Sequence, residues 1–241
     1  MRISEIPKPD TDTAYIIGTG PSLRCMPLDW FRDKFTIGLN QAYKHLPCRY
    51  SITVHPELVA EYCELARTGI PHLTKWVVKK KAPMADLKLD DPNYYVFGTT
   101  YDLSEVAKRP KDTLYLGEGV QTCAMDLAFR LGLKYVVLVG CDAAALGGDY
   151  HAHDQHVRWL GLDPNDQYAL YRDRTAQVRA VLRPLGLQVM SMNPFIGATG
   201  AQEDYERLCR ELRLDKLPEP KDTSGYTRTM PRDNTDRGGK K

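Results

Sequence analysis

The chain has 241 residues, of which 42% are hydrophobic and 27% are charged, and its formal net charge is +2. This composition is that of a globular protein, and the small net charge excludes a strong overall field directed at nucleic acid or a membrane surface. No apolar run approaches the roughly 18 residues that a membrane-spanning helix needs. The polar, proline-containing start of the chain differs from a signal peptide. We therefore expect a cytoplasmic protein without a membrane span.

The first half of the chain alternates short apolar runs with polar segments. A polar residue or a proline follows the clearer runs, as expected where parallel strands end. Strands are predicted at residues 14–18, 35–40 and 50–54, a helix at 56–67, and weaker strands at 76–78 and 94–97.

The pattern is stronger from residue 119 onward, where apolar helices and a buried strand alternate. Helices are predicted at residues 120–131, 168–185 and 202–214, and strands at 135–140 and 187–191. Strands that alternate with helices predict an α/β fold with a Rossmann-like, mostly parallel sheet and helices on both faces. We assign residues 1–215 to this domain and residues 216–241, rich in Pro, Gly, Thr and charge, to a disordered tail.

A glycine-rich turn directly follows the first predicted strand. It contains Gly18, Thr19 and Gly20, with Ser22 two residues later. Glycines in this position allow a tight turn and the close approach of a phosphate to backbone N–H groups beside a helix N-terminus. A plain tight turn without a ligand is the alternative.

The turn lacks two parts of the dinucleotide-binding fingerprint. Leu23 stands where the third glycine is needed, and the second strand ends in Asn40 rather than in Asp or Glu. Asparagine both donates and accepts hydrogen bonds, which suits a base edge or a sugar hydroxyl. The pattern predicts a nucleotide site that differs from that of an NAD dehydrogenase.

A second polar cluster surrounds the helix predicted at 120–131. Gly119, Gln121 and Thr122 lie at its start, where backbone N–H groups lack intrahelical partners. Asp142 follows the strand at 135–140 and should lie at the carboxyl edge of the sheet, where open α/β sheets bind ligands. We assign Asp142 to the catalytic residues, with a helix cap or loop bracket as the alternative.

Three histidines, His151, His153 and His156, share the loop after Asp142. Histidine serves as an acid or base near neutral pH, contacts phosphate or binds a metal. A catalytic or phosphate-binding role, a metal site and a polar surface loop all remain open at this point. The six cysteines contain no Cys-x-x-Cys pair, and we assign no metal site.

Five segments carry a family resemblance: IIGTGPSL, LNQAY, TVHPEL, GVQTCAMDLAFRLGLKYVVLVGCD and VMSMNP. In this order they resemble the bacterial family 42 sialyltransferases, which use CMP-sialic acid, and the related archaeal-type 6-hydroxymethylpterin diphosphokinases. The resemblance spans roughly residues 15–194. It implies that the nucleotide is held by the glycine turn and Ser22, by Asn40 and by the segment around Gly119, Gln121 and Thr122.

The sequence departs from the sialyltransferase pattern at several of these places. That family usually has Asn at the positions of Thr19 and His55, and it carries its catalytic histidine in a lid before the next long helix. The corresponding region here, residues 163–174, contains Tyr168 and Arg172 but no histidine. Tyrosine and arginine are suited to holding a diphosphate. By this resemblance the base would come from His151, His153 or His156, or the chemistry differs.

Three functions are compatible with these patterns. The favoured one is a glycosyltransferase with a nucleotide-sugar donor and no tightly bound cofactor. The others are a diphosphokinase that uses ATP and Mg²⁺, and a non-catalytic nucleotide-binding protein of the same fold. The acceptor and the oligomeric state are left open, although Lys79, Lys80, Lys81 and the basic tail would suit a polyanion such as nucleic acid.

Overall fold

The computed structural model describes residues 1–55, 57–59, 61, 75–79, 94–106, 111–146, 152, 164–192 and 226–227. Within these residues, no helix has the length and apolar character needed to cross a membrane. Of the helix predicted at 56–67, residues 57–59 and 61 are helical and the rest lie outside the described part. The helix predicted at 202–214 lies wholly outside it.

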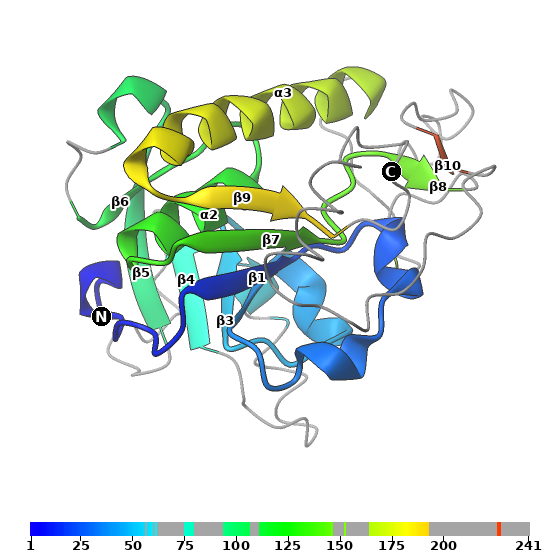
Figure 1. Cartoon of the computed structure of the whole chain (residues 1–241), viewed down its shortest axis with the longest axis horizontal. Coiled ribbons are helices and arrows are strands. Elements are labelled where there is room, and N and C mark those ends of the chain that lie inside the picture. Colours follow the sequence, from blue (N-terminus) through cyan, green and yellow to red (C-terminus); the bar gives the residue numbers. More distant parts are fainter. Residues whose placement is uncertain are drawn as a thin grey trace.

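Eight strands form one sheet in the order β6-β5-β4-β3-β2-β1-β7-β9, and every neighbouring pair is parallel (Figure 1). The predicted α/β, Rossmann-like class is therefore confirmed. In chain order the strands are β1 (Thr13–Ile17), β2 (Thr36–Leu39), β3 (Tyr50–Thr53), β4 (Lys75–Lys79), β5 (Tyr94–Thr100), β6 (Thr113–Tyr115), β7 (Tyr135–Val139) and β9 (Gln188–Ser191).

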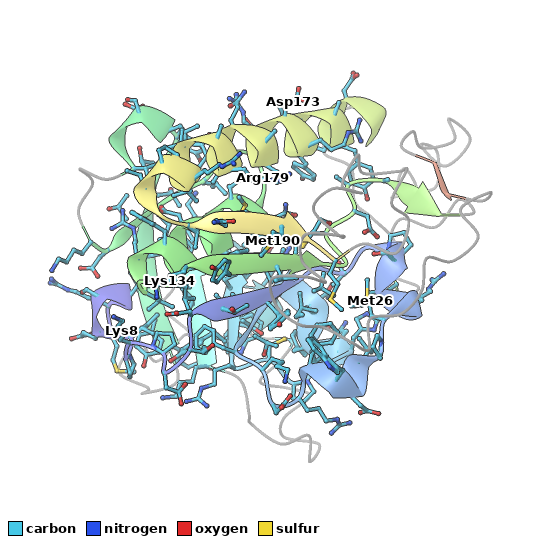
Figure 2. All side chains as sticks on the ribbon, viewed as in Figure 1. Lys8, Met26, Lys134, Asp173, Arg179 and Met190 are labelled. Carbon is cyan, nitrogen blue, oxygen red and sulfur yellow. The ribbon has the colours of Figure 1, made fainter. Side chains whose placement is uncertain are left out.

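Two α-helices connect strands across one face of the sheet. α2 (Val120–Arg130) joins β6 to β7, and α3 (Pro164–Leu182) joins β7 to β9. A helix between two parallel strands runs back against them, so both helices begin at the carboxyl edge of the sheet. Figure 2 shows Asp173 on the outer side of α3, where it is exposed, whereas Val178 and Leu182 of α3 are buried in the core.

Short 3₁₀-helices cover the opposite face. The main ones are η2 (Pro21–Cys25), η3 (Leu28–Phe31) and η4 (Asn40–Lys44), and η1 (Ile3–Glu5), η5 (Leu103–Glu105) and η6 (Arg183–Leu185) lie elsewhere. Successive side chains of a strand point to opposite faces. Ala14 and Ile16 of β1 accordingly pack in the core under α2, while Tyr15 and Ile17 pack against the 3₁₀-helices. Burial on both faces explains why the strand runs are continuously apolar.

Some elements differ from the sequence prediction. β6 was not predicted, and α3 begins at Pro164, four residues before the predicted start. Proline suits the first turn of a helix because its missing N–H has no intrahelical acceptor there. The last residues of the helix predicted to end at 185 form η6, which is followed by the capping residue Gly186 with φ 96°.

A second, antiparallel pair joins β8 (Ala145–Leu146) to β10 (Tyr226–Thr227). β10 falls inside the segment predicted to be a disordered tail, and the other residues of that segment lie outside the described part. The pair lies beyond the carboxyl edge of the main sheet, next to the loop that follows β7 (Figure 1).

Candidate functional site

A cleft opens at the carboxyl edge where the strand order reverses. The chain goes from β1 outward through β2 to β6, and it then returns to place β7 on the other side of β1. Ligands of open α/β sheets bind at such a switch point. The cleft contains about 870 Å³ of space, part of it open to solvent, and is lined by the ends of β1, β2, β3 and β7, the start of α2 and one face of α3.

Most of the predicted site residues line this cleft. Those that do are Gly18, Thr19, Gly20, Asn40, His55, Gly119, Gln121, Thr122, Asp142 and Tyr168. Ser22 and Arg172 lie behind the lining and contact residues that form it. His151, His153 and His156 lie outside the described residues.

The glycine turn is packed directly against the loop after β7. The Gly18 N–H donates to the Val139 carbonyl and the Gly20 N–H donates to the Gly140 carbonyl, each at 2.7 Å. A Cβ added at Gly18 would overlap the Gly140 carbonyl oxygen, and one at Gly20 would lie 2.6 Å from an Asp142 carboxylate oxygen. The glycines are therefore required by the approach of two loops, and their N–H groups are already bonded within the protein.

Asp142 holds these two loops together through Ser22. The Ser22 N–H donates to one carboxylate oxygen at 2.8 Å, and the Ser22 hydroxyl donates to the other at 2.6 Å. Asp142 is 4% exposed and Ser22 is fully buried. Charged hydrogen bonds of this kind are stronger than neutral ones. Asp142 thus has the bracketing role that was the alternative to catalysis, while its edge still lines the cleft.

The histidine-bearing loop is fixed to the same turn at one described residue. The Ala152 N–H donates to the Thr19 carbonyl at 2.8 Å, and the Ala152 carbonyl accepts a hydrogen bond from Arg24 Nε at 3.1 Å. Ala152 stands between His151 and His153 in the sequence. The loop therefore passes beside the glycine turn at this point.

The ends of β2 and β3 meet at Asn40. The Thr53 hydroxyl donates to Asn40 Oδ1 at 2.9 Å and also accepts a hydrogen bond from the His55 N–H at 3.0 Å. Since Oδ1 is used by Thr53, the amide N–H groups of Asn40 are the donors that this residue offers to the cleft. The imidazole of His55 lies 3.2 Å from a carboxylate oxygen of Glu57 and is about half exposed.

The start of α2 is shaped by the buried hydroxyl of Thr122. This hydroxyl donates to the Gly119 carbonyl at 2.8 Å and accepts a hydrogen bond from the Gly117 N–H at 2.9 Å. It therefore fixes the chain that enters the helix, and the first residues of α2 line the cleft. The helix dipole makes this end of α2 favourable for a negatively charged group.

Replacing Thr122 with valine tests this arrangement. Valine keeps the shape of threonine but removes the hydroxyl to which the Gly117 N–H donates and which donates to the Gly119 carbonyl. We expect a loss of about 2 kcal/mol in the free energy of unfolding, measured by urea denaturation. Thr122→Ser keeps the hydroxyl and should lose less than half as much. Equal losses in the two variants would show that the hydroxyl does not fix this turn.

One face of α3 forms an aromatic wall. The rings of Tyr168 and Tyr171 lie 6.1 Å apart between centroids, and both residues line the cleft. Burial and the nearby Glu118 carboxylate raise the pKa of Tyr171, and a hydrogen bond with Gln167 opposes them. The side chain of Gln121 donates to the Thr175 hydroxyl at 3.0 Å, which ties α2 to α3.

Arg172 of α3 is directed at the loop after β7 and is not among the residues that line the cleft. Its guanidinium Nη1 donates to the Ala143 carbonyl at 2.8 Å. This bond holds Ala143, whose φ of 45° is unusual for a residue other than glycine. Arg172 therefore supports the cleft wall from behind.

Backbone strain is concentrated in this cleft. Among the described residues, the non-glycine residues with positive φ are Asn40 at 49°, Glu118 at 67° and Ala143 at 45°, and all of them line the cleft. Such conformations cost energy and cluster at functional sites. Glu118, Ala143, Tyr171 and Thr175 also line the cleft, although the sequence did not lead to their assignment to the site. The pair of glycines around Glu118 is the one signal that would have pointed to a strained turn.

The cysteine in the cleft is a poor nucleophile. Cys141 is partly buried, and burial followed by the charge of Asp142 raises the pKa of its thiol far above the usual range. The thiol therefore stays protonated at neutral pH. In the part of the chain that the structure describes, no three His, Cys, Asp or Glu residues lie close enough together to hold a metal ion.

The site thus combines a braced glycine turn, a helix N-terminus, an amide donor and an aromatic wall at one switch point. No family model matches the chain, and no curated protein matches it significantly.

Proposed function

We propose that this protein is a group transferase that binds a nucleotide-activated donor, a nucleotide-sugar, in the cleft at the switch point. The observation that carries the proposal is the concentration of strained non-glycine residues in this one cleft. Strained backbone conformations cost stability, and in proteins they cluster at active sites and ligand-binding sites. Their location, at the carboxyl ends of parallel strands, is where open α/β sheets place a nucleotide.

In this proposal each element has a defined role. The start of α2 receives the phosphate, because its backbone N–H groups and its dipole favour a negative charge. Asn40 donates to the base or the sugar through its amide. Tyr168 and Tyr171 provide the apolar surface against which a flat or cyclic part of the donor packs.

The base that deprotonates the acceptor hydroxyl is a histidine of the loop that contains His151, His153 and His156. The backbone N–H of Ala152, which belongs to this loop, donates a hydrogen bond to the carbonyl of Thr19 at the edge of the cleft. This contact supports the assignment of the base to the loop. The imidazole would take the proton as the acceptor oxygen attacks the donor sugar and the nucleotide leaves. Developing charge on the leaving phosphate would be stabilised at the start of α2.

A thermal-shift screen of CMP, CDP, UDP, GDP and ATP, each with and without Mg²⁺, tests the proposal. A ligand that binds the folded state stabilises it and so raises the melting temperature. At a concentration of 100 times its dissociation constant, the ligand adds about 2.7 kcal/mol to the free energy of unfolding. We expect a shift with one nucleoside mono- or diphosphate that does not require Mg²⁺. A shift with ATP only when Mg²⁺ is present would favour the diphosphokinase instead. No shift with any nucleotide would contradict the proposal.

A further inference from the structure

Glu118 is a cleft residue whose side chain the roles above do not use. It lies between Gly117 and Gly119 in the turn that enters α2, its side chain is exposed, and it lines the cleft. Its φ is 67°, in the left-handed region. It is the one residue of this entry turn, 117–119, with a positive φ.

A glycine at this position would take the same backbone conformation without strain. The left-handed region brings the Cβ of other residues close to the following carbonyl oxygen, which glycine avoids. The neighbouring positions are glycines, yet the strained position carries a long acidic side chain. The side chain is therefore retained at a cost in stability, which indicates that the cleft uses its carboxylate.

The chemistry of the Glu118 carboxylate limits which groups of a ligand can contact it. Glu118 lies two residues before the first residue of α2, and its charge is close enough to Tyr171 to help raise the pKa of that phenol, after burial. A carboxylate accepts hydrogen bonds from O–H and N–H groups. The part of the ligand that meets Glu118 must therefore present O–H or N–H donors.

We infer that Glu118 accepts hydrogen bonds from the ribose diol of the bound nucleotide, which makes the cleft selective for ribonucleotides over deoxyribonucleotides. This inference rests on the proposed function. Dinucleotide-binding folds hold the diol with an acidic residue at the end of the second strand, and that position is Asn40 here. Glu118 lines the same cleft as Asn40 and supplies a carboxylate that the end of the second strand lacks.

The test compares one ribonucleotide with its 2′-deoxy analogue. The ribonucleotide is the one that gives the largest shift in the screen above, and affinities are measured by isothermal titration calorimetry. We expect the wild type to bind the ribonucleotide about 10-fold or more tightly than the deoxy form, because a hydrogen bond to a charged group is lost. Glu118→Gly and Glu118→Gln should reduce this preference to about 3-fold or less, with little change in the affinity for the deoxy form.

Two controls separate the side chain from the fold and from net charge. Glu118→Gly should be at least as stable to urea as the wild type, because glycine relieves the left-handed strain. Asp173→Asn, on the outer side of α3, removes one negative charge away from the cleft and should keep the ribose preference (Figure 2). Equal binding of both nucleotides by the wild type, or an unchanged preference in both Glu118 variants, would overturn the inference and leave the proposed function standing. No binding of any nucleotide would overturn both.

Discussion

Gly18→Ala is expected to lower the free energy of unfolding by about 3 kcal/mol. The added Cβ would overlap the Gly140 carbonyl oxygen, which belongs to the backbone of the loop after β7 and has no rotamer through which to move away. The two loops must then separate, and the bonds from Gly18 to Val139 and from Gly20 to Gly140 lengthen. Urea denaturation at neutral pH measures the loss.

Gly98→Ala is the matched control for this change. Gly98 lies in β5, and a Cβ there would meet its nearest atom, the Thr113 hydroxyl oxygen, at 3.4 Å. A side-chain hydroxyl can shift slightly, so we expect a change below about 1 kcal/mol. Similar losses in the two variants would mean that any glycine in the sheet is equally sensitive and that the loop contact is not decisive.

Asp142→Ala is expected to cost about 3–4 kcal/mol, because it removes two hydrogen bonds to a buried carboxylate and leaves the Ser22 N–H and hydroxyl without their acceptor. Asp142→Asn keeps one carbonyl acceptor and should lose less. The same urea experiment on both variants gives the comparison. It also shows whether a loss of ligand binding in either variant follows from unfolding.

A double-mutant cycle shows whether Ser22 is the partner that matters. We expect the losses in Ser22→Ala and Asp142→Ala to be non-additive, with a coupling energy of about 1–2 kcal/mol. Additive losses would place the role of Asp142 elsewhere. A loss below about 1 kcal/mol in Asp142→Ala would contradict the bracketing role altogether.

Much of the sheet could be predicted because strands that are buried on both faces have continuously apolar sequences. The segments that became β1 and β7 are continuously apolar, and the predicted bounds are within one residue of Thr13–Ile17 and Tyr135–Val139. β6 has three residues, Thr113–Tyr115, and is defined by its pairing with β5, which is a distant contact that local pattern does not contain. The 3₁₀-helices are too short to show a helical period.

The composition of the cleft could be predicted, but the roles of several of its residues could not. Carboxyl ends of parallel strands meet at one edge, so residues such as Asn40 and Asp142 were expected to converge. Which partner each side chain finds depends on the loop geometry: Asp142 binds Ser22, and Arg172 binds Ala143. Glu118 was not assigned to the site because its positive φ is imposed by the fold, and the two glycines around it are the one local sign of a strained turn.

Blocking the cleft without disturbing the fold tests the central claim most directly. Gly119 has φ −134° and ψ 149°, which any residue can adopt, and a Cβ there would make an ordinary contact of 3.5 Å with the ring of Tyr171. Gly119→Leu should therefore cost about 1 kcal/mol at this N-cap position, while its side chain extends along the Tyr171 ring into the cleft. The measurement is calorimetric titration of both proteins with the nucleotide that gives the largest thermal shift. We predict at least a 10-fold weaker affinity in the folded variant, and an unchanged affinity would contradict the assignment of the nucleotide to this cleft.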